Sequence, residues 1–257
     1  MKTVYGRLIG VSLGPGDPGN ITRRGWAALT SSARWLYPVK REGEESFALD
    51  IVRRAELTIP ADAVALVFPM TTQPELLARA WARAATQSVE LLASGRDAVF
   101  LVEGDASTYA TFGHLARAVR ELAPEVDVEV IPGVSSYCAA AAAVGLPLAD
   151  ADDTLAVIPT SYGVAVIDHL LDEFDSLVLL KVKPLLDEVI DLLERRNLLA
   201  ETVFIEKVGT PEERLIRDVT TLKGETVSYL SLMLIHNVHR IRRVPEKRGC
   251  RKKPVLA

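Results

Sequence analysis

Residues 5–20 read YGRLIGVSLGPGDPGN. The first part of this stretch, Tyr5 to Leu13, is rich in Leu, Ile and Val and predicts a β-strand. The second part, Gly14 to Asn20, predicts a tight turn, because glycine and proline both interrupt regular structure. A helix is expected from about Ile21 to Ser32. A strand, a turn and a helix in this order are typical of an α/β protein.

The same alternation continues to residue 131, where short apolar runs of strand length are separated by segments of helix length. In proteins with this rhythm each helix crosses between parallel strands, so we expect a largely parallel first sheet. The expected strands cover residues 35–39, 65–68, 98–102 and 126–131, and the expected helices cover residues 46–55, 74–93 and 107–122.

The second half predicts another α/β domain with a more mixed sheet. Its last expected strands, 202–208, 215–222 and 227–235, are separated by short turns bearing Gly209 and Gly224. Because a parallel return needs a crossover of about a dozen residues, we expect these strands to pair antiparallel. The other expected strands are 155–158 and 177–181, and the expected helices are 135–144, 164–174 and one that begins near Pro184.

The predicted limits are 1–133 for an N-terminal α/β domain, 134–243 for a C-terminal α/β domain and 244–257 for a basic tail. From Arg240 onward there are eight basic residues and one acidic residue, which leaves 22 basic and 33 acidic residues before it. Such a tail suits nucleic acid or another anionic ligand, or a solvated terminus. We favour the solvated terminus and do not expect a nucleic-acid partner.

The composition is that of a folded, water-soluble chain. Of the 257 residues, 49% are hydrophobic and 25% are charged, with a formal net charge of -4, which excludes a disordered chain. No apolar run approaches the roughly 20 residues of a membrane span, and no apolar segment of a signal peptide follows Met1. Cys138 and Cys250 alone make neither a disulfide framework nor a four-ligand metal site, so we expect a reduced, cytoplasmic protein.

Glycine and hydroxyl or carboxyl residues gather where strands are expected to end, which is where open α/β sheets bind ligands. The turn at Gly14 to Asn20 matches a dinucleotide loop poorly, because Pro15 and Pro18 lack the N–H groups that cradle a pyrophosphate. No Gly-Lys-Ser/Thr motif occurs. The other strand-end segments are 68–71, 103–109, 132–136 and 206–209.

Several polar residues in these segments have a structural and a functional interpretation. Asp105 either caps the next helix or binds a ribose or a cation, and Ser135 and Ser136 either cap a helix or bind an anionic group. His236 and His239 lie close in the sequence but have no third ligand nearby, so no metal site is predicted. No GxSxG nucleophile motif is present.

In order and spacing, these segments resemble the tetrapyrrole methylases that use S-adenosylmethionine, over roughly Gly6 to Asn237. They look most like the precorrin-2 or cobalt-factor II C20-methyltransferases of cobalamin (vitamin B12) synthesis. The motifs that carry the resemblance are Gly14 to Pro18, Phe68 to Thr71, Gly104-Asp105-Ala106, Tyr109 to Phe112, Ile131 to Ser136, Leu146 to Leu148, Phe204 to Gly209 and Ser228 to Leu232.

The resemblance implies two α/β domains with the cofactor in the cleft between them, and a homodimer. The implied reaction moves a methyl group from S-adenosylmethionine to C20 of precorrin-2 or cobalt-factor II, leaving S-adenosylhomocysteine. The implied cofactor-binding residues are Glu103, Gly104, Asp105, Thr108, Tyr109, Ser135, Ser136, Lys181, Val182, Glu206, Lys207, Val208, Leu230, Ser231 and Leu232.

The substrate carries several carboxylates, so cations are expected around it, and arginine suits them because its planar fork binds both oxygens. Arg24, Arg79 and Arg83 are further candidates for this role, although each is also an ordinary exposed charge. The loop at Gly14 is expected over the substrate. The predicted substrate-binding residues are Gly14, Pro15, Gly16, Asp17, Arg23, Lys40, Met70 and Thr71.

Two departures from the family pattern matter. Ala106 replaces the usual proline, which is expected to loosen the cofactor loop without removing a ligand side chain. Tyr37-Pro38 stands where related uroporphyrinogen methylases have Tyr-Asp, so the aspartate that is a candidate base there has no counterpart. Asp105 or Tyr109 is then a candidate to remove the C20 proton, but no catalytic base is assigned.

Three other functions fit parts of the sequence. A methylase of the same fold can act on another tetrapyrrole position, on diphthine or on ribosomal RNA, because fold does not fix substrate. A nicotinamide-binding oxidoreductase is suggested only by the strand–helix rhythm and the Gly14 turn. A noncatalytic tetrapyrrole or nucleic-acid binding module is suggested by the tail. The sequence does not distinguish a metal-free substrate from a cobalt-bearing one.

Overall fold

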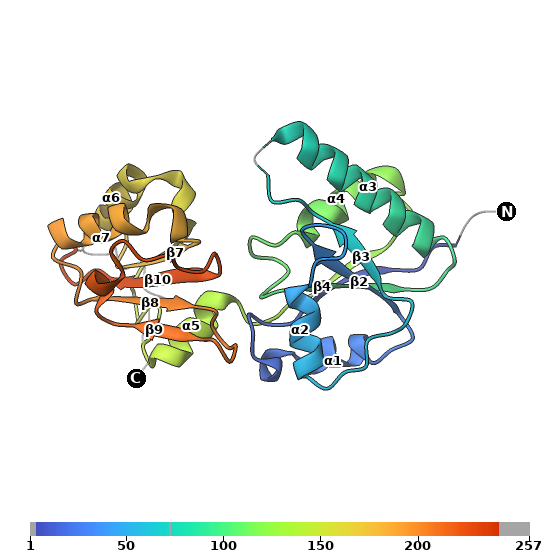
Figure 1. Cartoon of the computed structure of the whole chain (residues 1–257), viewed down its shortest axis with the longest axis horizontal. Helices are drawn as coiled ribbons and strands as arrows, with labels where there is room; N and C mark the ends of the chain where they lie inside the picture. Colours follow the sequence, from blue (N-terminus) through green and yellow to red (C-terminus); the bar gives the residue numbers. More distant parts are fainter. Residues whose placement is uncertain (1–3, 72, 242–257) are drawn as a thin grey trace, which may run out of the picture.

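The computed structural model describes residues 4–71 and 73–241, which form two five-stranded sheets (Figure 1). The strands of the first sheet lie in the order β3-β2-β4-β1-β5, and every pair is parallel, as the alternation predicts. Their bounds are β1 Leu8–Ser12, β2 Arg34–Val39, β3 Val64–Val67, β4 Ala98–Val102 and β5 Val128–Ile131.

Helices cover both faces of the first sheet, because its strands carry apolar side chains on both sides. On β4, Phe100 and Val102 face α3 and α4, whereas Val99 and Leu101 face α1 and α2. The bounds are α1 Arg23–Leu29, α2 Phe47–Arg54, α3 Pro74–Leu92 and α4 Phe112–Leu122, with a short 3-10 helix at Pro18–Asn20.

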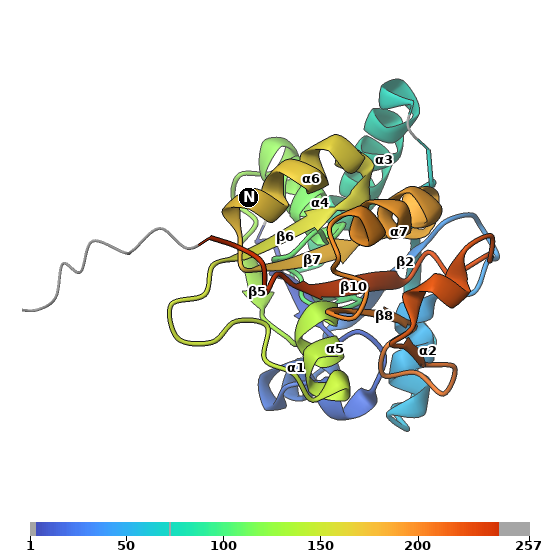
Figure 2. The same ribbon diagram turned by 90° about the vertical axis from the view of Figure 1, so that its left-hand side faces the viewer.

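The second sheet is mixed and has the order β6-β7-β10-β8-β9. Only β6 and β7 pair in parallel; the other neighbours are antiparallel. Helix α5 packs on one face, and α6 and α7 pack on the other (Figure 2). The bounds are β6 Leu155–Pro159, β7 Ser176–Leu180, β8 Thr202–Glu206, β9 Arg214–Ile216, β10 Ser231–His236, α5 Ser136–Val144, α6 Val164–Glu173 and α7 Leu186–Arg195.

Two expected elements differ most from the structure in extent, and a third, the strand expected over 227–235, begins only at Ser231. The helix expected from residue 107 begins only at Phe112, because Tyr109 has a left-handed φ of 51° that a helix does not tolerate. The strand expected over 215–222 is limited to Arg214–Ile216, and a 3-10 helix follows at Val219–Leu222, where the Asp218 side chain accepts a hydrogen bond from the Thr220 N–H.

The expected antiparallel pairing is right for β8 with β9 and for β8 with β10. The three strands do not form a simple meander, however, because β8 lies between β9 and β10, and β10 separates β8 from β7. The strand β10 thus begins beside the ends of both β7 and β8, which positions residues of all three strands at one edge.

The predicted limit near Gly133 falls in the connection between β5 and α5, and α5 packs on the second sheet. The numerical domain limits stay a prediction, and the basic tail 244–257 lies outside the described residues. None of the helices in the described ranges is long and apolar enough to cross a membrane.

Candidate functional site

Ser12, at the end of β1, ties together three loops at the carboxyl edge of the first sheet. Its side chain is fully buried. The hydroxyl donates to the Ile131 carbonyl at 2.7 Å and accepts from the Ala106 N–H at 2.8 Å. Gly133 lies so close that a Cβ there would be 2.4 Å from the Ser12 Cβ. The loops after β1, β4 and β5 are therefore held in one fixed arrangement.

The hydrogen bond of the Ala106 N–H bears on the expectation that alanine here loosens the loop after β4. Proline at this position, as in the family pattern, has no N–H to donate. Alanine supplies the donor, and the residue is buried. Ala106 therefore anchors the loop to Ser12, a residue that the sequence alone did not single out, by a hydrogen bond that proline does not make.

Asp105 organises the loop after β4 and does not cap a helix, because α4 begins only at Phe112. Its carboxylate accepts hydrogen bonds from the Ser107 hydroxyl, from the Thr108 hydroxyl at 2.9 Å and from the Gly133 N–H at 3.2 Å. Burial acts to raise the pKa of Asp105, but these hydrogen bonds outweigh it and leave the pKa below its usual range. Asp105 is therefore a stable anion at neutral pH.

Glu103, two residues earlier, is in the opposite electrostatic situation. It is half-buried, and its carboxylate accepts no hydrogen bond from any residue in the described ranges. Burial raises its pKa to about 7, and the nearby charge of Lys40 counteracts this only in part. The site therefore contains one carboxyl group fixed as an anion and another that changes its charge near neutral pH.

The ends of β7 and β8 meet the start of β10 on the other side of the site. Lys181 and Lys207 follow these strands with left-handed φ values of 57° and 52°. Their N–H groups donate to the carbonyls of Ser231 and Leu230, both at 2.8 Å. Such a conformation is uncommon for a residue with a side chain, so these hydrogen bonds hold two strained turns at one edge.

Several predicted cofactor side chains on this edge already have protein partners. Glu206 accepts from Arg214 Nε at 2.8 Å and from the Ser228 N–H at 2.7 Å. Lys207 forms an ion pair with Glu212. Their side chains therefore stabilise the turns, and what they present to a ligand is the backbone.

The two halves meet through the loops at these edges (Figure 1). A Cβ on Gly16 would lie 2.4 Å from the Val208 carbonyl oxygen, and a Cβ on Gly209 would lie 2.6 Å from the Asp17 nitrogen. The Tyr109 hydroxyl donates to the Val157 carbonyl on β6 at 2.9 Å. The Gly14–Asp17 loop, predicted to cover the substrate, thus packs directly against predicted cofactor residues.

Ser135 and Ser136 lie between the halves, at the start of α5. Ser135 occupies the N-cap position and is buried, but its side chain makes no capping hydrogen bond. The capping interpretation is therefore not realised. The hydroxyl and the first N–H groups of α5 are oriented as a helix N-terminus that favours an anionic group.

The predicted substrate residues lie on the side of the N-terminal sheet. Arg23 and Lys40 are exposed, the Met70 side chain is 60% exposed, and Thr71 is partly exposed. Arg24, considered as a further cation, is instead paired with Glu129.

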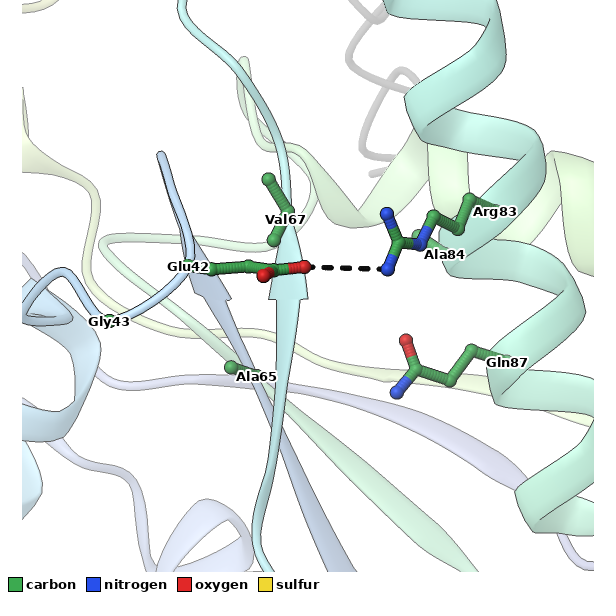
Figure 3. A pocket seen from close by; sticks show the side chains of 7 residues that line it. All are labelled: Glu42, Gly43, Ala65, Val67, Arg83, Ala84 and Gln87. Atoms are coloured by element: carbon green, nitrogen blue, oxygen red, sulfur yellow. Dashed lines mark hydrogen bonds and ion pairs between the residues drawn. The ribbon is translucent and has the colours of Figure 1, made fainter.

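Arg83 is also paired, with Glu42 at 3.4 Å, in a hollow of about 250 Å³ between β3 and α3 (Figure 3). This hollow lies beside the outermost strand of the sheet, and Arg83, a further candidate for the substrate, is the one predicted site residue that lines it. Its lining residues are Glu42, Gly43, Ala65, Val67, Arg83, Ala84 and Gln87.

The described residues contain no group of three or more His, Cys, Asp or Glu side chains able to hold a metal ion. His236 Nδ1 lies 3.2 Å from the Ser176 hydroxyl, and His239 Nε2 lies 3.2 Å from the Asn197 carbonyl. The two histidines therefore have separate, structural partners.

The arrangement of two α/β halves joined at their strand ends matches a known family. The family model described as Tetrapyrrole (Corrin/Porphyrin) Methylases matches residues 7–223. The chain belongs to the tetrapyrrole methylases. This confirms the family resemblance drawn from the strand-end motifs.

Among curated relatives of this methylase, the cobalt-precorrin-2 C(20)-methyltransferase of Salmonella typhimurium is 31% identical over 90% of the chain and 96% of that protein. The precorrin-2 C(20)-methyltransferase of a Sinorhizobium species is 30% identical over 90% of the chain and 95% of that protein. The crystal structure of uroporphyrin-III C-methyltransferase from Thermus thermophilus with S-adenosylhomocysteine has 23% identity and a TM-score of 0.64, covering 90% and 92% of the two chains. The last likeness shows the fold.

Proposed function

We propose that this methylase transfers a methyl group from S-adenosylmethionine to C20 of a precorrin-2-type tetrapyrrole in cobalamin biosynthesis. The observation that carries the proposal is the match, over 90% of the chain, to two relatives that are both named C20-methyltransferases. The Phe68 to Thr71 segment, typical of the C20 branch, lies at the carboxyl edge of the first sheet, directly after β3.

We place S-adenosylmethionine between the two halves, where the strand ends converge. The loop held by Asp105 and the N-terminus of α5 at Ser135 offer N–H groups and a hydroxyl from one side. The turns at Lys181 and Lys207 and the start of β10 offer backbone from the other side. The fit is supported by the Ser135 hydroxyl, which has no capping role, and by Asp105, whose negative charge suits a positively charged sulfur compound.

When bound, this cofactor supplies an electrophilic methyl group on a positively charged sulfur. The protein then has to align C20 with that methyl group and exclude water, which together can contribute several kcal/mol. The rigid connection through Ser12 fixes the loops that would perform the alignment. The contact of Gly16 with the turn at Val208 closes one side of the site.

For the tetrapyrrole we propose the surface formed by the Gly14–Asp17 loop, Arg23, Lys40, Met70 and Thr71. Arg23 and Lys40 have no ion-pair partner in the described part of the chain, so they are available to substrate carboxylates. Met70 exposes an apolar side chain that suits the face of a macrocycle.

The test is methyl transfer with labelled S-adenosylmethionine to metal-free precorrin-2 and, separately, to cobalt-factor II. We expect one added methyl group in the product mass, and NMR should place the label at C20. The substrate that reacts faster answers whether the natural form holds cobalt. Label at another carbon, or on diphthine or ribosomal RNA instead, would assign a different methylase activity.

We also propose that the protein is a homodimer and acts in the cytoplasm; both proposals rest on the family resemblance and the composition. Sedimentation equilibrium of the full chain tests the first, with twice the 28.0 kDa chain mass expected. A mass of one chain at micromolar concentration would refute it.

A further inference from the structure

We propose that Glu103 is the general base that removes the C20 proton, and that the positive charge of Lys40 favours its ionised form. This inference rests on the proposed function and adds a residue that the sequence analysis placed only among cofactor contacts. It assigns a catalytic role to the side chain of Glu103, separate from the part that its backbone plays in the cofactor loop.

The position of Glu103 in the fold is the first argument. It follows directly after β4, which is the central strand of the first sheet, so it lies in the middle of the carboxyl edge. On one side, Gly104 and Gly14 exchange backbone hydrogen bonds at 2.8 and 3.2 Å, which fixes the loop after β4 against the loop after β1. On the other side is β2, which ends just before Lys40.

Glu103 is recessed but remains in contact with solvent, and no described residue donates a hydrogen bond to its carboxylate. Partial burial removes some of the hydration of this carboxylate without giving it a protein partner, which disfavours its charged form. Glu103 is thus placed beside the proposed cofactor loop with a carboxylate that the fold itself does not employ.

The two bases considered from the sequence are committed elsewhere. Asp105 accepts hydrogen bonds from Ser107, Thr108 and the Gly133 N–H, and these keep its pKa below the usual range, so it is a weak proton acceptor. The Tyr109 hydroxyl donates to the Val157 carbonyl, which uses its proton in the contact between the halves.

The electrostatics of Glu103 suit the role. Burial raises its pKa to about 7, and Lys40 is the charged group of the described chain that acts to lower it. The neighbouring loops bring Gly14 and Gly104 to this place, and neither carries a charge. A base is most effective when its pKa lies near the operating pH, where enough of it is ionised and proton transfer is still favourable.

The step balances without another reactant. An electron pair of the macrocycle forms the bond from C20 to the methyl carbon, and the pair of the sulfur–methyl bond stays on sulfur, which becomes a neutral thioether. The C20–H bond then breaks, its electron pair returns to the macrocycle, and the proton moves to a Glu103 carboxylate oxygen. The proton is released to solvent before the next turnover.

The experiment compares Glu103→Gln with the wild type in kcat against pH from 5.5 to 9, with S-adenosylhomocysteine binding measured by titration calorimetry. Glutamine keeps the size of the side chain but does not accept the proton. We expect kcat of Glu103→Gln to fall about 100-fold or more, with loss of the rise in rate near pH 7 and an unchanged Kd for S-adenosylhomocysteine. Glu45→Gln, an exposed change in the loop after Lys40, is the matched control and should behave as the wild type.

Lys40→Gln is the second variant. Because Lys40 lowers the pKa of Glu103, its removal should move the rise in rate to higher pH. An increase in KM for the tetrapyrrole would report a contact of Lys40 with a substrate carboxylate. Loss of that contact alone would not shift the pH profile of kcat.

Retention of wild-type kcat and of the rise near pH 7 in Glu103→Gln would overturn the assignment. A weaker Kd for S-adenosylhomocysteine in Glu103→Gln would overturn it too, because it would make the side chain a cofactor contact. If either of these results is found while the wild type transfers methyl groups to C20, only the base assignment fails. A wild type that transfers none to either tetrapyrrole overturns the proposed function together with the base.

Discussion

The raised pKa of Glu103 predicts that the wild-type protein loses stability as the pH rises, and that Glu103→Gln does not share this loss. Burial raises the pKa of the carboxyl from its ordinary value of 4.5 to about 7 in the folded protein. The folded state therefore binds this proton more tightly than the unfolded state does. Between these two values, ionisation favours the unfolded chain, so the free energy of unfolding falls with increasing pH.

The size of the effect follows from the two pKa values. Each tenfold difference in proton affinity corresponds to about 1.4 kcal/mol, so the full cost of the ionised carboxylate is about 3 kcal/mol above pH 7. At pH 5 the cost is about 1 kcal/mol, because most of the unfolded chain but little of the folded protein is ionised. Replacing Glu103 with glutamine should thus stabilise the protein by about 2 kcal/mol more at pH 8 than at pH 5.

The assay is urea unfolding of Glu103→Gln, Glu45→Gln and the wild type at pH 5, 6, 7 and 8, followed by circular dichroism. Glu45 is exposed, so Glu45→Gln should have the same free energy of unfolding as the wild type at each pH. It is the control for the removal of a carboxylate outside the site. The reasoning is refuted if the difference between Glu103→Gln and the wild type is the same at pH 5 and pH 8, because the carboxyl would then have the same pKa folded and unfolded.

Four further predictions concern the loops around the site. Ser12→Ala should destabilise the protein by about 1–3 kcal/mol, because the buried Ala106 N–H loses its acceptor, whereas Ser88→Ala, which removes one bond within α3, should cost less in the same unfolding assay. Gly209→Ala should lower Tm more than Gly224→Ala: both glycines have a left-handed φ, of 75° and 77°, but only at Gly209 does an added Cβ meet the other half of the chain. Asp105→Asn should weaken binding of S-adenosylhomocysteine by about 10-fold in calorimetry, and an unchanged Kd would remove Asp105 from the cofactor loop. Because the pKa of Asp105 is lowered, the stability lost in Asp105→Asn should be full at pH 7 and vanish as the pH falls through the pKa of the folded protein, the opposite trend to Glu103→Gln.

The sequence was sufficient for most of the element order and for the edge at which the site lies. The strand Ala98–Val102 is found where it was expected, and the other strands of the first sheet differ by a few residues at most. Strand and helix periodicity arise from neighbouring residues, and glycine and proline punctuate the chain locally. Because parallel strands end at the same edge, the motifs after β1, β4 and β5 could also be placed together without a structure.

The sequence was misleading where a local pattern competes with distant contacts. The segment from Ser107 has helical composition, but the hydrogen bonds of Asp105 and the left-handed Tyr109, whose hydroxyl reaches β6, delay α4 to Phe112. The segment 215–222 has strand composition, but it is divided by the turn that Asp218 caps. In both cases side chains that bond to their own turn or to another element override intrinsic propensity.

The sequence by itself determined the strand and helix order, the convergence of the motifs and the family, because these depend on residue types and on their spacing along the chain. Only the tertiary structure decided that Ser12 holds the loop at Ala106 and that Glu206 is bound to Arg214. Only the tertiary structure also decided that the pKa of Glu103 is raised whereas the pKa of Asp105 is lowered. The two carboxyl groups are two residues apart, and the sequence offers no means to tell them apart. Their difference comes from burial and from the hydrogen bonds that Ser107, Thr108 and the Gly133 N–H donate to Asp105 alone, and free energies of that kind exist only once the chain is folded.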